Sequence, residues 1–320
     1  MKSRSSICMF LAVAMILSAG VAFGQDYPKK AIRIVASEAG SSNDMVARMI
    51  ADGLQKRFNQ PVMVENRGGG VIAGAVVAQA PPDGYTLLYF ANGLWITPLM
   101  RPKMPYDVMK DFAPISWVVT VPNVVVVHPA FPAKSIKELI AMAKAKPGSI
   151  KYASASAGTA NHLAAELFKY MAHVDLDRIP YKGMAPALNA TMSGETSVMF
   201  PSAGVTMATY VKTGKLRALA VTTKKPSPLT PGLPTVAETV PGYESNVDHG
   251  VFAPAGTPAP IINLLNKEIA HILHQDDVKK KLANLGLEVV ASSPEELRNL
   301  MKSDVESMGK LIKAAGITDN

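Results

Sequence analysis

The stretch IRIVASEAGSSND (residues 32–44) has a counterpart in IKYASASAGTANH (residues 150–162). Each begins with an apolar run typical of a strand and continues through a loop of Gly, Ser and Ala. Each then leads into residues whose apolar positions repeat at helical spacing. Because this strand–loop–helix unit occurs once in each half of a 320-residue chain, we expect an α/β protein of two lobes.

Apolar runs alternate with helical segments along the rest of the chain, which favours α/β lobes built on mainly parallel sheets. Strands are expected at residues 32–35, 62–64, 86–90, 123–128, 150–154, 178–181, 197–200, 216–221 and, at a sheet edge, 287–290. Helices are expected at residues 44–58, 70–79, 135–146, 160–171, 184–192, 207–212, 260–274 and 294–315. Ser135 with Glu138, and Ser293 with Pro294 and Glu296, are typical helix starts.

The domain organisation follows from two proline-rich stretches, at residues 98–122 and 226–234. We expect the first to lead from lobe 1 to lobe 2 and the second to lead back. The C-terminal helices then pack on lobe 1, which makes that lobe discontinuous. The predicted division is a signal peptide at 1–24, lobe 1 at 25–122 plus 224–320, and lobe 2 at 123–223.

The N-terminus has the pattern of a secretory signal peptide. Lys2 and Arg4 precede an apolar run at residues 7–17, and small residues lead to an expected cleavage before Gln25. The run is short for a membrane span, although a retained anchor helix is the alternative. The only cysteine, Cys8, lies in that run, so the mature protein would have no disulfide or thiolate chemistry. We expect a soluble, periplasmic protein.

The charge of the chain is positive without a concentrated basic region. Removal of Lys2 and Arg4 takes the formal net charge from +8 to about +6. The short lysine runs at residues 29–30, 224–225 and 279–281 are typical of solvated surface. Export argues against a nucleic-acid partner, and a mildly positive field favours encounters with anions.

The two loops have the composition of an anion-binding site. A helix start leaves backbone N–H groups without partners and carries partial positive charge, and small residues let a ligand approach the backbone. Either loop alone is also an ordinary helix cap, but one on each lobe favours a carboxylate in a shared cleft. The candidate ligand-binding residues are Ser37, Glu38, Ala39, Gly40, Ser41, Ser42 and Asp44 on lobe 1, and Ser154, Ser156, Ala157, Gly158, Thr159 and His162 on lobe 2.

Several short motifs, in order and spacing, resemble the substrate-binding receptors of tripartite tricarboxylate transporters, the Bug family of periplasmic receptors. They are YPKKAIR (27–33), VENRGGG (64–70), PDGYTLL (82–88), KDFAPI (110–115), PYKG (180–183), GKLRALAV (214–221) and APAGTP (253–258). The resemblance covers nearly the whole mature chain. It implies a type II Venus-flytrap fold, no catalysis, no cofactor, and membrane transporter subunits as partners.

In that family the two loops hold a ligand carboxylate, partly through ordered water, which implies the same role for the two loops here. The first loop departs from the family pattern, because Ser37 stands for an aromatic residue, Gly40-Ser41 for a glycine pair, and Glu38 adds a negative charge. Pro201-Ser202 stands where an acidic pair often follows the strand, which makes Ser202 a further candidate. The ligand class is a small carboxylate of open identity.

Aromatic side chains offer one more candidate feature. Trp95, Tyr181 and Phe200 could form an aromatic wall beside the ligand, and core packing is the alternative role. We count Tyr181 among the ligand-binding candidates. The chain is expected to be monomeric.

Other functional classes fit the sequence less well. The glycines at 68–70 do not match the dinucleotide fingerprint, and His271 with His274 lack the further ligands of a metal site. A secreted hydrolase of small esters or amides is the main alternative, although no G-x-S-x-G elbow occurs. A structural or adhesion module is a third, and a stoichiometric small acid would exclude it.

Overall fold

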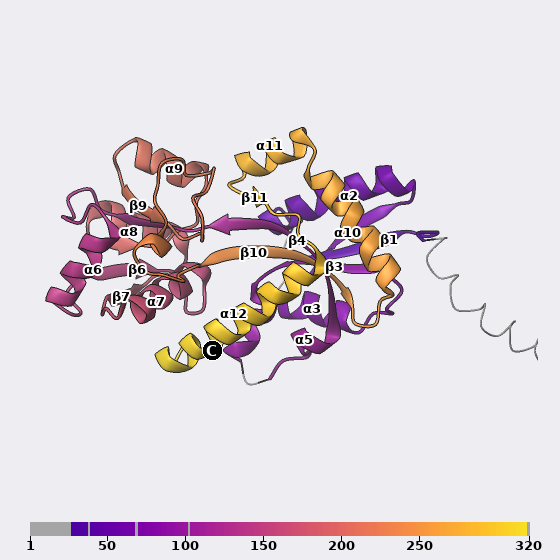
Figure 1. The fold of residues 1–320 in the computed structure, drawn as a ribbon, viewed down its shortest axis with the longest axis horizontal. Helices are drawn as coiled ribbons and strands as arrows, with labels where there is room; N and C mark the ends of the chain where they lie inside the picture. Colours follow the sequence, from indigo (N-terminus) through magenta and orange to yellow (C-terminus); the bar gives the residue numbers. More distant parts are fainter. Residues whose placement is uncertain (1–26, 38, 68–69, 102, 319–320) are drawn as a thin grey trace, which may run out of the picture.

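Two sheets, one in each lobe, organise the molecule, which we describe from a computed structural model covering residues 27–37, 39–67, 70–101 and 103–318. The strands of lobe 1 are β1 (Ile32–Ala36), β2 (Val62–Asn66), β3 (Thr86–Ala91), β4 (Phe112–Pro122), β10 (Asn246–Pro254) and β11 (Glu288–Val289). Those of lobe 2 are β5 (Val124–Val127), β6 (Lys151–Ser154), β7 (Asp177–Pro180), β8 (Val198–Met199) and β9 (Arg217–Val221). The lobes lie side by side along the long axis (Figure 1), so the expected two-lobed α/β fold is confirmed.

Strand order shows that both sheets are mixed. The order is β11-β4-β10-β3-β1-β2 in lobe 1 and β7-β6-β8-β5-β9 in lobe 2. β1 pairs in parallel with β2 and β3, whereas β10 is antiparallel to both β3 and β4. The expectation of mainly parallel sheets was therefore wrong. The reason is topological, because a strand that leaves a lobe and the strand that returns must run in opposite directions.

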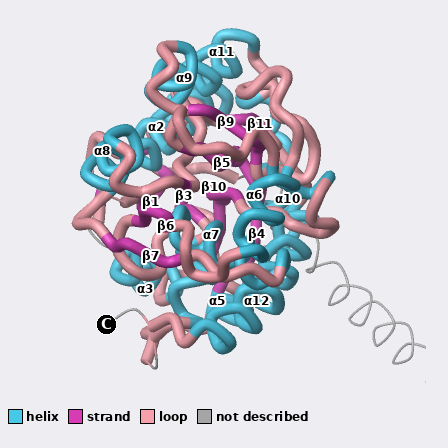
Figure 2. Tube along the Cα trace, turned by 90° about the vertical axis from the view of Figure 1, so that its left-hand side faces the viewer, coloured by secondary structure: helices cyan, strands magenta, loops and turns pink. Residues whose placement is uncertain are grey.

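Helices cover both faces of each sheet. In lobe 1, α2 (Ser42–Phe58), α10 (Ala259–Leu273) and α11 (Asp276–Asn284) contribute to one core, and α3 (Gly70–Ala78), α4 (Gly93–Ile96), α5 (Val108–Asp111) and α12 (Pro294–Ala315) to the other. In lobe 2, α6 (Ile136–Ala145) and α7 (Ala160–Ala172) lie on one side, and α8 (Met184–Ser193) and α9 (Val205–Lys212) on the other. Figure 2 shows lobe 2 end-on, with its helices around the strands.

The period-two pattern of the strands explains how each sheet serves two cores. In β5, Val124 and Val126 enter one core, while Val125 and Val127 enter the other. In β1, Ile32 and Ile34 enter the core under α2, and Val35 enters the opposite one. Each such buried side chain stabilises the fold by roughly 1.5–3 kcal/mol relative to exposure. Strands buried on both faces read as unbroken apolar runs, which is how the sequence presents them.

The first crossing between the lobes lies where it was expected, although the chain there forms a strand, and the second lies further along the chain than expected. Residues 98–122 were expected to be a connecting passage, but β4 occupies 112–122 and enters the lobe 1 sheet as an 11-residue strand. The stretch 226–234 was expected to lead back, but Val221 N–H donates to Pro234 O, so this stretch returns to β9. β10, which follows it, makes the return crossing (Figure 1).

The C-terminal segment packs on lobe 1 as expected, and β11 is the predicted edge strand. The expected helix start at Ser293 is present, and Ser293 and Glu296 form a capping box at the start of α12. Ser135 caps α6, but the Glu138 carboxylate accepts from Lys134 N–H instead of closing a box with Ser135. α12 continues below β10 to contact α7 of lobe 2, so it forms a further bridge between the lobes (Figure 1).

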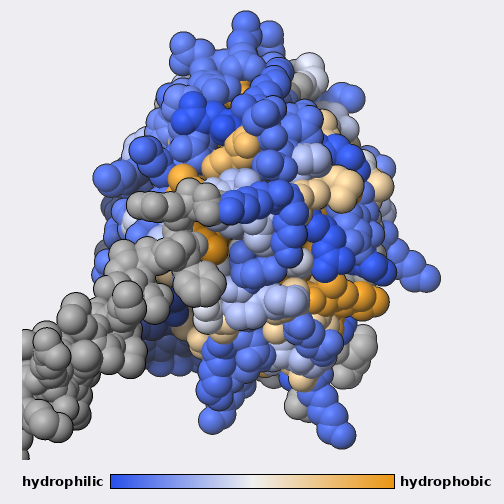
Figure 3. Space-filling model, turned by 90° about the vertical axis from the view of Figure 1, so that its right-hand side faces the viewer, coloured by the Kyte–Doolittle hydropathy of each residue, from blue (hydrophilic) through white to orange (hydrophobic). Residues whose placement is uncertain are grey.

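The surface agrees with a chain whose charges are spread out. The lysines at 29–30, 224–225 and 279–281 are exposed, as are His271 and His274. The outer end of lobe 1 is mostly hydrophilic, with a few small apolar areas (Figure 3). Across the described ranges, no helix combines the length and the apolar character that crossing a membrane requires. The predicted signal peptide, with Cys8 and the cleavage point, lies outside these ranges.

Candidate ligand-binding site

The strand directions place both loops at sheet edges near the hinge. β1 is parallel to β3, and β3 is antiparallel to β10, so β1 runs toward the edge of the sheet at which β10 starts. In lobe 2, β5 leaves the hinge, β8 runs antiparallel to it, and β6 runs parallel to β8. β6 therefore ends toward the hinge as well. The loops at residues 37–44 and 154–162, here called loop 1 and loop 2, follow these two strand ends.

Loop 1 turns at Gly40, whose φ of 78° favours glycine. Gly40 N–H donates to Asp44 Oδ2 at 2.9 Å. Ser41 is the N-cap of α2, and its hydroxyl accepts from Asp44 N–H at 3.2 Å. The Ser37 and Ser41 hydroxyl oxygens lie 3.2 Å apart. Loop 1 is therefore closed by its own side chains.

Asp44 connects loop 1 to the rest of lobe 1. Its Oδ1 accepts from Asn66 Nδ2 at 2.8 Å and from Arg48 Nε at 2.9 Å. Burial alone would raise the pKa of Asp44, but hydrogen bonds from Gly40 and Asn66 and the Arg48 charge hold that pKa below its usual value. Asn66 Nδ2 also donates to Ser37 O at 2.8 Å. Loop 1 thus carries an ionised carboxylate at the start of its helix.

Loop 2 repeats the backbone of loop 1. Gly158 has φ 75°, and its N–H donates to His162 Nδ1 at 3.0 Å, four residues on. The N-cap Thr159 has φ −69° and ψ 155°, against −72° and 164° for Ser41. Burial, assisted by the Arg178 charge, lowers the pKa of His162 to about 4, so this imidazole is neutral at pH 7. The group that holds the glycine is an anion in loop 1 and neutral in loop 2.

Arg178 of β7 holds the first residues of loop 2 through hydrogen bonds. Its Nε donates to Ser154 Oγ at 2.7 Å and its Nη2 to Ala155 O at 3.1 Å. Tyr181 lies on the same side, with its N–H bonded to Ser154 O at 2.8 Å and its hydroxyl to Glu195 Oε1 at 2.9 Å. A guanidinium group therefore lies against the loop that precedes the start of α7.

Each loop leaves one buried amide atom without a partner. Asn43 Oδ1 and Asn161 Nδ2 are buried and unbonded, and both residues are the second residue of their helix. Asn161 is 2% exposed, and its Oδ1 is bonded to the Thr159 hydroxyl at 2.6 Å. Buried polar atoms without partners are uncommon and each calls for a reason. Their matching positions indicate a common cause.

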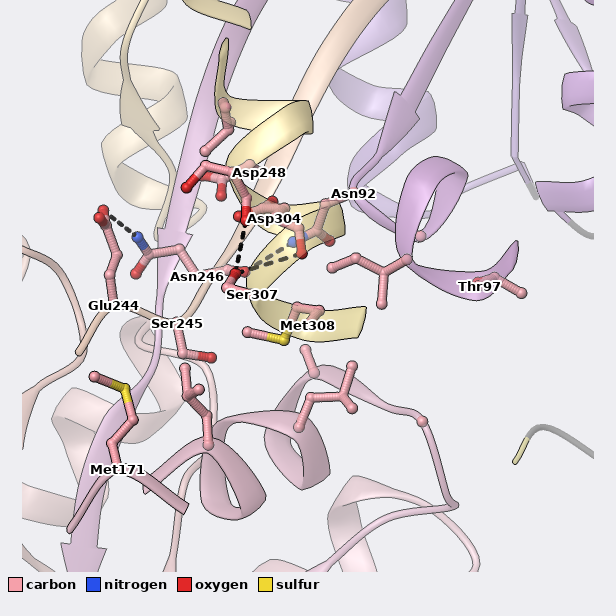
Figure 4. A pocket seen from close by; sticks show the side chains of 18 of the residues that line it. Asn92, Thr97, Met171, Glu244, Ser245, Asn246, Asp248, Asp304, Ser307 and Met308 are labelled. Atoms are coloured by element: carbon pink, nitrogen blue, oxygen red, sulfur yellow. Dashed lines mark hydrogen bonds between the residues drawn. The ribbon is translucent and has the colours of Figure 1, made fainter. Parts of the chain in front are cut away.

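An interlobe cavity of about 320 Å³ lies beside loop 2 (Figure 4). Gly158 and α7 line it from lobe 2, and Asn92, Asp248 of β10 and Asp304 of α12 line it from lobe 1. Burial, with Coulombic repulsion among the acids, raises the pKa of Asp248 to about 8, and burial chiefly raises that of Asp304 to about 6. Asp248 Oδ1 accepts from the Thr120 hydroxyl, across the paired hinge strands.

The structure brings only some of the predicted residues to this cavity. Gly158 lines it, whereas Ala39, Gly40, Ser156 and Ala157 are not among its lining residues and are partly or fully exposed. Ser202 lies at the hinge, where its hydroxyl donates to Asn123 Oδ1. Glu38 falls outside the described residues.

The proposed aromatic wall is not present. Trp95 and Phe200 are 0% exposed and belong to the core that runs through both lobes. Their alternative role, core packing, is correct, and Trp95 Nε1 donates to Asp304 Oδ2 at 2.8 Å. Of the three aromatic residues, Tyr181 contacts loop 2, through the hydrogen bond from its N–H to Ser154 O.

Sequence reasoning missed four side chains that shape the site: Asn66, Asn161, Arg178 and Asp248. Asn66 belongs to β2 and Arg178 to β7, and both strands are remote in sequence from the loops that these residues hold. Asn161 could have been found, because it stands at the position of loop 2 that Asn43 occupies in loop 1. Within the described ranges, no three or more His, Cys, Asp or Glu side chains are placed so that they could hold a metal ion.

Comparison with known proteins defines the class first. A receptor from Polaromonas, described as a TctC solute binding protein without ligand, has TM-score 0.81 at 27% identity, covering 90% of this chain and 99% of that one. The R. palustris protein Rpa4515, solved with adipate, has TM-score 0.72 at 34% identity, covering 92% and 99%. The MatC protein of Rhodopseudomonas palustris, solved with malate, has TM-score 0.68 at 28% identity, covering 89% and 100%. The fold is that of a two-lobed solute-binding protein.

The family follows from the sequence. Residues 46–317 match the model of the tripartite tricarboxylate transporter family receptor. The protein BugT of Bordetella pertussis is 33% identical over 316 residues, covering 97% of this chain and 96% of that one. A UPF0065 protein of Pseudomonas sp. (strain P51) is 35% identical over 315 residues, covering 97% and 94%. The chain belongs to this receptor family, which is one of binding proteins and not of enzymes.

Proposed function

We propose that this receptor captures a small carboxylate between loop 1 and loop 2 and presents it to the membrane subunits of a tripartite tricarboxylate-type transporter. The observation that carries the proposal is the repeated backbone of the two loops. Each presents a helix start with a glycine at positive φ, and each lies at the hinge edge of its own sheet. Such helix starts favour anions.

The ligand class is supported by relatives of similar length and fold. One was solved with adipate and another with malate, both small dicarboxylates. The proposed contacts are the backbone of Ala39, Gly40, Ser41 and Ser42 in loop 1 and of Ala157, Gly158 and Thr159 in loop 2. The remaining candidates, Ser37, Glu38, Asp44, Ser154, Ser156, His162, Tyr181 and Ser202, shape or flank those contacts.

Closure of the lobes would complete the site. Each loop lies on its own lobe, so a ligand held by both loops must lie between the lobes. Ligand binding then favours the closed state, because only there do both loops contact it. In this proposal lobe 1 ends at residue 122 and resumes with β10 at residue 246, and lobe 2 comprises residues 123–245.

Export completes the proposal. Residues 1–24 serve as a signal peptide, and the monomeric mature chain works in the periplasm. Transport energy comes from the membrane subunits, since the receptor only shifts between open and closed states.

Calorimetry on residues 25–320 with adipate, malate, citrate, aspartate, nicotinate and benzoate tests this function. We expect one acid per chain, with stabilisation of about 2.7 kcal/mol at a hundred times the dissociation constant. Gly158→Val should lose at least tenfold in affinity, because a side chain there is strained and meets Met100. Gly214→Val, at φ 70° with open space, is the matched control. Hydrolysis of dimethyl adipate, or no binding of any acid, would contradict the proposal.

A further inference from the structure

We infer that Arg178 and Asn161 make lobe 2 the half of the receptor that neutralises the ligand carboxylate, so that the receptor selects ionised carboxylates over their neutral amides. This inference rests on the proposed function and assigns the charge recognition within it. It follows from the difference between two loops that share one backbone.

Loop 1 opposes a negative ligand. Asp44 is ionised and lies at the third residue of α2, where it already offsets the positive end of the helix. The nearest cation, Arg48, has its Nε 2.9 Å from Asp44 Oδ1 and its Nη2 3.0 Å from Asn66 Oδ1. The positive charge of loop 1 is therefore committed to its own carboxylate. Loop 1 can offer hydrogen bonds to a ligand but no net positive charge.

Loop 2 has no such offset. The equivalent residue, His162, is neutral, and the first turn of α7 contains no acid. Arg178 adds a full positive charge, and in the described part of the chain no carboxylate lies within 4.0 Å of it. The nearby Glu166 carboxylate is bonded to Lys169 and Tyr152. An unpaired guanidinium and an unopposed helix start thus occur together.

Arg178 has donors left for a ligand. Its Nε and Nη2 are used by Ser154 Oγ and Ala155 O, which fix the plane of the guanidinium. Its Nη1 donates to no acceptor among the described residues. A guanidinium whose Nη1 has no partner among the described residues keeps donors with which it can form charge-assisted bonds to a carboxylate oxygen.

Asn161 supplies a second and independent observation. Its Nδ2 is buried in the first turn of α7 without an acceptor, in a residue only 2% exposed. A buried donor left unbonded costs about 1–3 kcal/mol. The Thr159 hydroxyl holds the other end of the amide at 2.6 Å, so the free N–H is fixed at the helix start. A carboxylate oxygen, or a water bound to one, would satisfy it.

The test compares Arg178→Met with Arg48→Met, the matched arginine of lobe 1. The probes are the tightest-binding acid of the panel above and its neutral amide. Arg178→Met should weaken binding of the acid by about 10- to 100-fold, the range of a hydrogen bond to a charged group. It should weaken binding of the amide by no more than about threefold, through loss of the bonds to loop 2, and Arg178→Lys should recover part of the loss for the acid. Arg48→Met should stay within about threefold of the wild type, because its charge is already paired.

Asn161→Leu should weaken binding of the acid about tenfold. Thr230→Val, which removes an unbonded buried hydroxyl outside both loops, is its control. Equal losses in Arg178→Met and Arg48→Met, an unchanged affinity in Arg178→Met, or equal weakening of acid and amide would overturn the inference. The last outcome would show that Arg178 only braces the loop. If Arg178→Met shows no cooperative unfolding and is therefore not folded, the same affinities are measured for Arg178→Gln and Arg178→Lys. A wild type that binds none of the acids contradicts the receptor function itself, which distinguishes the two failures.

Discussion

Loop 1 and loop 2 show how one backbone can be held by two different sets of side chains. Both turn at a glycine with φ near 75°, and both bond that glycine to the residue four positions on. In loop 1 this residue is an ionised acid with donors from three elements, and in loop 2 it is a neutral imidazole with one. Backbone geometry therefore sets the kind of site, whereas the supporting side chains set its charge.

We expect the largest effect from removal of the Asp44 carboxylate, which holds loop 1 in place. Asp44→Ala should destabilise the receptor by about 3 kcal/mol, because Gly40 N–H and the Asn66 amide lose a buried acceptor and Arg48 loses its partner. Urea unfolding would measure it. Asp44→Asn, which keeps the shape, should cost less. His162→Ala leaves one donor unbonded, so a cost equal to or above that of Asp44→Ala would contradict this account.

The two loops should contribute differently to the pH dependence of the free energy of unfolding. The pKa of His162 falls from 6.5 to about 4 on folding, so the folded state binds fewer protons and His162 reduces stability as pH falls below 6.5. The pKa of Asp44 is lowered, so its contribution is present above 3.8 and lost only below it. Between pH 7.5 and 5, His162→Asn should remove roughly 1–2 kcal/mol of pH dependence.

Asp44→Asn should remove none of that dependence in the same window. The buried His249 titrates in the same direction, so the comparison is between each variant and the wild type, in which His249 is constant. A wild type and His162→Asn with parallel profiles would show that His162 is not buried in the folded receptor.

The smallest effect concerns the two helix caps. Ser41 accepts from Asp44 N–H, but Thr159 makes no cap bond. Ser41→Ala should cost about 1 kcal/mol, as N-cap removal commonly does. Thr159→Ala loses no cap bond, but it takes the donor from the buried Asn161 Oδ1, so we expect a cost no smaller than that of Ser41→Ala. Thermal unfolding of both variants would test this, and a smaller cost for Thr159→Ala would contradict it.

Much of this fold was predictable because local signals agreed with the tertiary structure. The unbroken apolar runs of β1 and β5 and the cap at Ser293 each encode their element locally. The eleven-residue β4 was missed because its prolines, Pro114 and Pro122, indicate a loop, whereas its place between two antiparallel partners overrides that local signal. The strand directions were missed for a similar reason, since they depend on how the chain crosses the hinge.

The site was predictable only as far as its backbone. Repeated Gly and Ser at residues 37–44 and 154–162 indicate two helix starts, and the structure has them. Asn66 and Arg178 could not be found, because they meet the loops only after β2 pairs with β1 and β7 with β6. Trp95 and Phe200 were misplaced as possible wall residues because burial, which no local pattern reports, decides their role.

Gly286, in the turn between α11 and β11, has a consequence for how closely the two lobes can lie. A methyl group there would lie 2.8 Å from Gly204 Cα and 2.9 Å from Ala203 O, both backbone atoms of lobe 2. The two halves therefore meet on this side main chain against main chain, with no flexible side chain to yield. Absence of a side chain at Gly286 permits this close approach, so any larger residue there would require the backbones of the two lobes to move apart.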